Sequence, residues 1–342
     1  MYSYFREIFS GSRLRTKFML FFIIFASVPI LALGGVSLYL IDISHRQDVS
    51  NLEEQLIDQK IEEIGKFFTE TLGALELLVS TDKLYIESSE QVFLLDWLIL
   101  GNKVFEEVSL INLRGQETEK RVKAEIESEA ELFDVSRLPK FASLQAGKNY
   151  IGDIKNTISG PLVTLATPVK NRNGAIMSYL SAEVNLFQLI KSIESSKLGS
   201  SGYLALLDKD GSLISRKGFK FALIGFDLSS ALRVKHILSG GVFSGLAGRD
   251  RYESFLTGAP VVGAGKQVRD IGWAIIAEWP ISDADAIIKD IRNQVVTLTI
   301  ISIMAVFISA PFFALRLLKP IHELEKGTAK IEEGNFEYRV NI

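Results

Sequence analysis

The sequence predicts an α+β protein in which one large folded region lies between two membrane-spanning helices. Two uncharged apolar runs, residues 18–41 and 293–315, each exceed the ~20 residues that a helix needs to cross the apolar core of a bilayer. Between them, residues 42–292 show a helical apolar repeat and then strand patterns separated by turns. Hydrophobic residues make up 47% of the chain and charged residues 23%, a composition that excludes an intrinsically disordered protein.

The composition and motifs also exclude several classes of function. The chain has no cysteine, which excludes disulfides, thiolate zinc sites, iron–sulfur clusters and cysteine nucleophiles. A net charge of −3 disfavours nucleic-acid binding, because such chains normally carry a basic excess. His45 and His236 have no second ligand at metal spacing, and no phosphate-binding GxxxxGK(S/T) loop occurs. We therefore expect no catalytic residues, no metal, no cofactor and no nucleic-acid partner.

The flanks of the two apolar runs predict their topology. The first run is longer than the apolar core of a signal peptide, about 7–15 residues, and a polar helix pattern follows it, which favours a retained span. The alternative for the second run is a buried helix of a soluble protein. Positive flanks stay in the cytoplasm, so residues 1–17 and 316–342 are expected there, with 42–292 outside. The basic flanking residues are Arg6, Arg13, Arg15, Lys17, Arg316 and Lys319.

An apolar stripe follows the first run. Its residues recur at steps of three and four, which predicts a long helix that continues the membrane helix outward. Two interpretations stay open: the stripe packs on its own domain, or its membrane-proximal part also forms a seam with a second copy of the chain. The stripe comprises Ile57, Ile61, Ile64, Phe68, Leu72, Leu75 and Val79.

The rest of the external region has the pattern of strands and turns. Residues 108–124 and 203–216 each predict a β-hairpin. Residues 162–184 and 258–280 each predict a further strand pair that ends in Ala-Glu and leads into a helix. The sequence thus contains the order hairpin, helix, strand, strand, helix twice.

The two units also have matching internal spacing. Gly115 precedes Glu183 by 68 residues, and Gly211 precedes Glu278 by 67. This agreement indicates a duplicated α+β module. Chance agreement is the alternative, since strand pairs are common.

A helix that leaves the membrane, followed by two such modules, resembles the double-Cache (dCache) extracytoplasmic sensor domain of bacterial receptors. The resemblance implies two PAS-like antiparallel sheets in an inner-membrane protein, with the sensor in the periplasm or extracellular space. It divides the external region into a stalk helix (42–80), a membrane-distal module (81–195) and a membrane-proximal module (196–292). The segments that carry the resemblance are 112–121, PKFASLQAGKNYIGDIKNTISGPLVTLATPVKNRNG (139–174), GYLALLDKDGSLIS (202–215) and GWAIIAEWP (272–280).

The resemblance implies a ligand pocket in the distal module, between the sheet and a covering loop-helix that corresponds to residues 137–150. Arg137 would then bind a carboxylate, and Asp153 would receive an ammonium group. Phe141 and Tyr150 would supply an apolar wall. Arg121, at the end of the first hairpin, is a further candidate.

Each of these candidates has a structural alternative. Arg137 would form a surface ion pair with Asp134 or Glu131. Asp153 would make a turn or strand-edge hydrogen bond, and Phe141 and Tyr150 would belong to the hydrophobic core. In amino-acid-binding members of the family, an Arg is followed two residues later by Trp-Tyr. Here Leu138, Pro139, Lys140 and Phe141 follow Arg137, which disfavours amino-acid recognition and leaves a carboxylate, another anion or an amine as the expected ligand.

The segment after the second run resembles the first half of a HAMP linker. At Pro320 the membrane helix would give way to a new helix. The apolar residues of this helix follow the steps of a parallel coiled-coil seam, and Gly334-Asn335 would end it. The resemblance implies that Pro320, Leu324 and Gly334 transmit a signal, and that the functional unit is a homodimer. The residues that carry it are Pro320, Leu324, Ile331, Gly334, Asn335, Phe336 and Val340.

These features predict a transmembrane receptor fragment in contact with membrane lipid. A small extracytoplasmic ligand would change the state of a cytoplasmic output domain, with a two-component histidine kinase and its response regulator as the favoured output. A methyl-accepting chemotaxis receptor, a diguanylate cyclase and a phosphatase are the alternative outputs. A membrane-anchored binding protein without enzyme output is the rival class.

Overall fold

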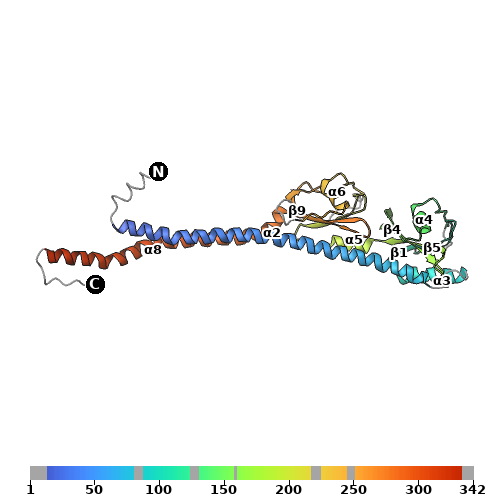
Figure 1. Ribbon diagram of the computed structural model, residues 1–342, viewed down its shortest axis with the longest axis horizontal. Helices are drawn as coiled ribbons and strands as arrows, with labels where there is room; N and C mark the ends of the chain where they lie inside the picture. Colours follow the sequence, from blue (N-terminus) through green and yellow to red (C-terminus); the bar gives the residue numbers. More distant parts are fainter. Residues whose placement is uncertain are drawn as a thin grey trace. The chain divides into compact units, whose positions relative to one another are not determined.

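The computed structural model describes residues 14–80, 88–123, 131–157, 160–216, 225–244 and 251–332 (Figure 1). The chain divides into two compact units. One unit combines Met1–His45 with Asp285–Ile342, and the other is Arg46–Ala284.

The first unit is built from two long helices. They are α2 (Leu14–Val79), which continues into the second unit, and α8 (Ala286–Glu332). In the part of the chain that the structure describes, Thr16–Val79 and Ile288–Ala314 have the length and hydropathy of membrane-spanning helices. The α8 helix runs through Pro311 and Pro320 without ending.

The first unit departs from the sequence prediction at Pro320, where a new helix was expected to begin. An interior proline removes one hydrogen bond but can kink a helix without ending it. Leu324 lies on the same helix and is exposed. Gly334 and the other residues of the predicted helix end lie outside the described residues, as do Arg6 and Arg13.

Within the described part of the first unit, α2 contacts α8 and the residue just before it, Asp285. The rings of Phe22 and Phe313 stack with centroids 5.4 Å apart. Gly34 lies so close to Thr299 that a Cβ atom on Gly34 would be 2.8 Å from the Thr299 hydroxyl oxygen. His45 Nε2 lies 3.7 Å from Asp285 Oδ1. Small residues let membrane helices approach closely, so the contact at Gly34 fits two packed spans.

The second unit contains two five-stranded antiparallel sheets with the same topology. The strand order is β2-β1-β5-β4-β3 in one and β7-β6-β10-β9-β8 in the other. The predicted duplication of an α+β module is therefore confirmed. The strands are β1 (Phe105–Ile111), β2 (Glu117–Val122), β3 (Tyr150–Thr157), β4 (Gly160–Lys170), β5 (Ile176–Asn185), β6 (Tyr203–Leu207), β7 (Leu213–Arg216), β8 (Arg251–Glu253), β9 (Pro260–Val268) and β10 (Trp273–Pro280).

Short helices connect and cover the strands. Figure 1 shows α4 and α6 each above its own sheet, while α5 joins the two modules. The helices of this unit are α3 (Ser88–Gly101), α4 (Pro139–Gln145), α5 (Phe187–Glu194), α6 (Leu232–Leu238) and α7 (Ile281–Ala284), besides α2.

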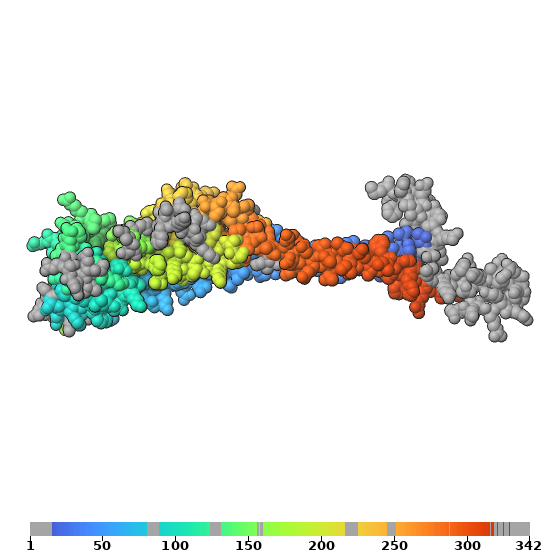
Figure 2. Space-filling view, turned by 180° about the vertical axis from the view of Figure 1, so that it is seen from behind, coloured from blue at the N-terminus to red at the C-terminus, as the bar shows by residue number. Residues whose placement is uncertain are grey.

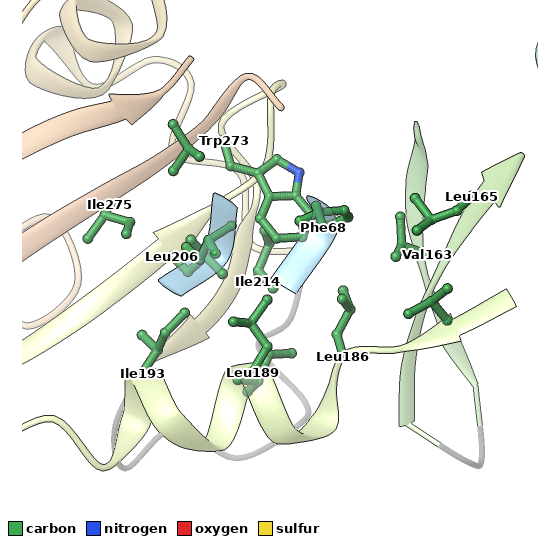
Figure 3. Packing of buried hydrophobic residues seen from close by; sticks show 14 of the residues in the cluster. Phe68, Val163, Leu165, Leu186, Leu189, Ile193, Leu206, Ile214, Trp273 and Ile275 are labelled. Atoms are coloured by element: carbon green, nitrogen blue, oxygen red, sulfur yellow. The ribbon is translucent and has the colours of Figure 1, made fainter. Parts of the chain in front are cut away.

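One hydrophobic core connects the stalk part of α2 to both sheets. The predicted apolar stripe supplies Ile57, Ile64, Phe68 and Leu75, all nearly inaccessible to solvent. Figure 3 shows Phe68 against Trp273 of the second sheet, and their rings meet edge to face with centroids 5.2 Å apart. The stripe therefore packs on its own domain, which is the first of the two interpretations that the sequence left open.

The same tight turn recurs in both modules. Gly115 and Gly211 have φ angles of +85° and +88°, which a residue with a side chain rarely adopts. A Cβ atom would lie 2.6 Å from the Cα atom of Ser136 at the first turn and 2.9 Å from that of Ser229 at the second. Only glycine fits both places, which explains the spacing that the sequence revealed.

Asp283 ties α7 to the loop that follows α5. Its carboxylate accepts hydrogen bonds from the backbone N–H groups and hydroxyls of Ser200 and Ser201 and from Trp279 Nε1. These bonds, the Ser200 hydroxyl first among them, hold the pKa of Asp283 well below its usual range. Gly199 lies under the Trp279 ring, where a Cβ atom would be 2.5 Å from the indole.

Candidate ligand-binding site

The candidate site is the face of the first sheet that α4 covers. Directly opposed residues of antiparallel strands share a face, and the register places Glu107 opposite Glu183 and Ser109 opposite Ser181. Thr164 of β4 is opposite Glu183 on the other side. The alternate residues of β1 and β5 point into the core against α2. The strand period thus brings a row of polar side chains to one face.

One end of this face is apolar. Phe141 and Leu144 of α4 are buried against Ile111 and Tyr179 of the sheet. The rings of Phe141 and Tyr179 meet edge to face at 5.6 Å. Tyr150 lies partly buried beside this cluster, and burial raises the pKa of its hydroxyl. A ligand at this face would therefore find an apolar surface next to the polar row.

Lys140 brings a buried cation to the polar row. Lys140 is the second residue of α4, and it is 9% exposed. Its Nζ donates a hydrogen bond to Ser181 Oγ at 3.2 Å. Burial lowers the pKa of this ammonium, and the nearby Glu183 carboxylate partly opposes that shift. Among the described residues, no other acceptor forms a hydrogen bond with this group, although an ammonium has three donors.

Among the described residues, only one of the two carboxylate oxygens of Glu183 has hydrogen-bond donors. Its Oε1 accepts hydrogen bonds from Thr164 Oγ1 at 2.7 Å and from Lys155 Nζ at 3.0 Å. Its Oε2 is buried and has no hydrogen-bond partner among the described residues. A buried carboxylate oxygen without a donor is costly, so this atom marks a place where a donor is missing.

Further charged residues complete the row. Lys120 Nζ lies 3.0 Å from Glu107 Oε1 and 3.8 Å from Glu117 Oε2. The Glu117 Oε2 atom also accepts the backbone N–H of Phe133 at 3.1 Å. With Lys140, Lys155 and Glu183, the face combines three ammonium groups with three carboxylates. Such a balanced set suits a ligand that itself carries both signs of charge.

The structure brings only part of the sequence-predicted site together. Phe141 and Tyr150 lie at the apolar end, although Phe141 is a core residue in its packing. Asp153 is exposed on β3 and forms an ion pair with Lys209 of the second module, 2.6 Å between Oδ1 and Nζ. Arg137 is exposed just before α4. Hydrogen bonds from Ser136 lower the pKa of Asp134, and the charge of Arg137 adds to that shift.

Arg121 lies on the opposite face of the sheet. It is opposite Val108, a residue of the core that α2 and α3 share. Its Nε lies 3.0 Å from Oδ1 of Asp96 on α3. Because strand residues alternate between faces, Arg121 points away from α4.

Sequence reasoning did not place Ser181, Glu183 or Lys155 in the site, and it named Lys140 only as one of the residues that follow Arg137. The repeated Ala-Glu at the ends of β5 and β10 was the available signal. It marks Glu183 and Glu278, which occupy equivalent register positions in the two sheets: Glu183 is opposite Thr164, and Glu278 is opposite Gly263. Within the described residues, no group of three or more acidic, histidine or cysteine side chains is arranged to hold a metal ion.

The equivalent position in the second module is filled by the protein itself. Glu278 is 1% exposed and accepts hydrogen bonds from Tyr252 and Ser254, at 2.8 and 2.6 Å, and from the Tyr203 hydroxyl. Burial, with Glu278 alongside, raises the pKa of Tyr252. The Arg233 guanidinium of α6 lies 4.1 Å from the centre of the Tyr252 ring.

Comparison with known proteins places this architecture in a family. The family described as the Cache 3/Cache 2 fusion domain matches residues 120–294. The chain belongs to this family, and it carries a double-Cache sensor domain of the kind found in transmembrane signalling receptors.

A curated relative and several solved structures agree with this assignment. The methyl-accepting chemotaxis protein McpA of Pseudomonas putida is 26% identical over 212 residues, which is 59% of this chain and 31% of McpA. The chain therefore spans about a third of that relative's length.

Three solved sensor domains have the same fold. The ligand-binding domain of the Pseudomonas fluorescens chemoreceptor CtaA, solved with L-isoleucine, has a TM-score of 0.53 at 15% identity and covers 71% of this chain and 97% of its own. The ligand-binding domain of Mlp24, solved with asparagine, has a TM-score of 0.52 at 21% identity, and the match covers 72% of this chain and 99% of that domain. The extracellular domain of vpHK1S-Z8, assigned as a histidine kinase, has a TM-score of 0.56 at 13% identity, and the match covers 71% of this chain and 98% of that domain.

Proposed function

We propose that this chain is the sensor and membrane part of a receptor whose first module binds a small molecule with both a carboxylate and an amino group. Lys140 and Ser181 would hold the carboxylate, and Glu183 Oε2 would accept the amine. The observation that carries the proposal is a pair of buried groups on one sheet face that lack partners among the described residues: an ammonium with one acceptor and a carboxylate oxygen with no donor. A zwitterion would satisfy both.

The residues named from the sequence take different places in this proposal. Phe141 and Tyr150 would contact the apolar part of the ligand at their end of the face. Arg137 and Asp153, both exposed, would act at the rim, where Asp153 would leave Lys209 and become a second acceptor for the ligand's amine besides Glu183. Arg121 would hold α3 against the sheet through Asp96 and would not touch the ligand. The named ligands of CtaA and Mlp24 are amino acids, which supports a zwitterion here. This proposal reverses the expectation from the residues after Arg137, which disfavoured amino-acid recognition.

The signal would travel from the sensor through α8 to a cytoplasmic output domain. Ligand binding would shift the population between two sensor states, and the difference in ligand affinity between those states limits the signal. We favour a histidine kinase with a response regulator, because the segment from Pro320 onward resembles HAMP linkers that precede kinases. The receptor would act as a homodimer in a bacterial inner membrane.

A chemotaxis receptor is the second candidate output, favoured by the similarity to McpA. The coding sequence beyond residue 342 of the parent gene separates the two. A completed HAMP followed by a His-Glu-x-x-x-Pro box and an ATP-binding domain would support the kinase. Long charged heptads with Glu/Gln methylation sites would replace it with the chemoreceptor.

A thermal-shift screen on residues 42–292 tests the ligand class. The panel contains amino acids, matched carboxylates without an amine, and matched amines without a carboxylate. A ligand at 100 times its Kd adds about 2.7 kcal/mol to the free energy of unfolding, which raises Tm by several degrees. We expect shifts from zwitterions that exceed those from either matched analogue. An equal shift from a simple carboxylate would remove Glu183 from the proposal, and no shift from any zwitterion would contradict it.

A further inference from the structure

A buried histidine lies where α2 meets the start of α8. His45 is 9% exposed, and its buried Nε2 atom has no hydrogen-bond partner in the part of the chain that the structure describes. Asp285 Oδ1 lies 3.7 Å from this atom, which is within reach of an ion pair but too long for a hydrogen bond. In Figure 2, α8 (orange to red) lies against α2 (blue) along the first unit. His45 is therefore a buried titratable group at a contact between two long helices.

The position of this contact links it to signalling. The first apolar run ends at residue 41, four residues before His45, and α2 is unbroken between them. Asp285 is the residue between α7 and α8, and α8 continues unbroken through the second apolar run. A change in the contact therefore changes how the two spans are held at the ends nearest the sensor.

The protonation state of His45 decides what this contact can be. Histidine is the side chain that normally changes charge between about pH 5 and 8. A protonated imidazole donates through both ring nitrogens, and its charge-assisted hydrogen bond to a carboxylate is about 2.7–2.9 Å long. Protonation therefore favours an approach of about 0.9 Å between Nε2 and Asp285 Oδ1, whereas a neutral imidazole has no charge that draws the carboxylate closer.

The other charges around the pair oppose one another. Within one turn of His45 or Asp285, the other charged residues are Asp42, Arg46 and Asp48 on α2, Asp283 on α7 and Lys289 on α8. The carboxylate of Asp283 already accepts hydrogen bonds from Ser200, Ser201 and Trp279. Of the other four, two are acidic and favour a charged imidazole, and two are basic and oppose it. Among the described residues, Asp285 is the charged group within ion-pair distance of His45.

We propose that His45 and Asp285 form a pH-sensitive latch between the two membrane helices. When the outside becomes acidic, the protonated imidazole binds Asp285 and holds α2 and α8 together at the ends nearest the sensor. As the pH rises above the range in which histidine is protonated, the imidazole loses its charge and the latch loosens. The proton would thereby bias the population of signalling states from a second site, separate from that of the ligand. The inference rests on the proposed membrane receptor but not on its ligand.

Spin-label distances in the full chain test the latch, because the native chain has no cysteine that would react with the label. Ile43→Cys and Ile291→Cys are introduced together, since these side chains are 44% and 47% exposed. The labelled chain is placed in lipid nanodiscs without ligand, and the distance distribution is measured at about pH 5.5 and about pH 8. Two further substitutions, His45→Gln and Asp285→Asn, each remove the latch. The matched control is His236→Gln, which removes an exposed histidine of α6.

We expect the shorter distance to be populated about twofold more, or better, at the lower pH. Both latch variants should lose this dependence, and either one suffices if the other does not fold. His236→Gln should keep it. Equal distributions at both pH values in the native background, or a dependence that survives in a folded latch variant, would overturn the proposal. Loss of the dependence in His236→Gln would also overturn it. No ligand is present, so a failed ligand screen leaves these results unaffected and the two proposals fail independently.

Discussion

The two sheet modules have the same strand order and a glutamate at the same register position, yet the hydrogen-bond donors around that glutamate differ. Glu278 in the second module is enclosed by the hydroxyls of Tyr203, Tyr252 and Ser254. Glu183 in the first module has Lys155 and Thr164 on one oxygen, and its other oxygen has no hydrogen-bond partner in the part of the chain that the structure describes. The comparison shows that two copies of one fold can surround the same buried glutamate with a full or a partial set of donors.

The covering helices repeat the same contrast. Each has a cation at its second position, Lys140 in α4 and Arg233 in α6. Arg233 lies over the Tyr252 ring, so aromatic side chains occupy the space beside Glu278. Among the described residues, Lys140 donates a hydrogen bond to the Ser181 hydroxyl alone. The described side chains therefore satisfy the buried polar groups of the second module and only part of those of the first.

The largest expected effect comes from removing the first module's cation. Lys140→Met should weaken binding of a carboxylate ligand by about 30- to 5,000-fold, because truncating one partner of a buried charge pair costs about 2–5 kcal/mol. Arg233→Met removes the equivalent cation of the second module and should change Kd less than twofold. Isothermal titration calorimetry measures both, and equal losses would mean that the modules do not differ as described.

The two glutamates should respond in opposite ways to neutralisation. Glu278→Gln places an amide NH₂ group against hydroxyl donors and should lower the free energy of unfolding by about 1–3 kcal/mol, or Tm by about 2–10 °C. Glu183→Gln should lower Tm by less than half as much but weaken ligand binding at least tenfold. Thermal unfolding with and without ligand distinguishes the two. A stable Glu278→Gln protein would argue that its hydroxyl cage is unimportant.

The two turn glycines should behave alike. Gly115→Ala and Gly211→Ala each force a side chain into the left-handed region, at about 1–2 kcal/mol, and against a serine backbone. Gly174→Ala is the control, since φ there is +81° but no atom lies within 4 Å of the added Cβ. Denaturant unfolding should rank both turn variants below the control. A tolerant Gly211→Ala would separate the second turn from the first.

The smallest effect concerns the ion pair that joins the modules. Asp153 and Lys209 are both exposed, so Asp153→Asn or Lys209→Gln should change stability by less than about 1 kcal/mol. If Asp153 exchanges Lys209 for the ligand's amine, Lys209→Gln should tighten binding slightly and Asp153→Asn should weaken it. Ligand titrations of both variants test this, and identical changes in Kd would leave Asp153 with a structural role alone.

The spacing of apolar residues and the positions of turn residues were enough to predict the architecture. The steps of the stripe around Phe68 indicated a helix, and the turns at Gly115 and Gly211 fixed two equivalent hairpins, because local chemistry decides these features. The continuation of α8 through Pro320 was not predicted, since a proline is compatible with either a helix end or a kink.

The candidate site was less accessible to sequence reasoning. Which face Arg121 occupies depends on strand register, and a shift of one residue reverses it. The burial of Lys140 depends on how α4 lies on the sheet, which no local pattern encodes. Glu183 was visible as half of a repeat, but only the pairing of both sheets shows that one copy is satisfied and the other is not.

The carboxylate of Asp283 gives the sensor a mechanical property. It clamps α7 to Ser200 and Ser201, in the short connection between the first module and the second. Only Asp285 separates α7 from the 47 residues of α8. That connection is therefore tied to a point one residue before a continuous helix that is about 70 Å long at 1.5 Å per residue. Along the chain, the hydrogen bonds of Asp283 thus link the junction of the two modules to the helix that would carry the signal.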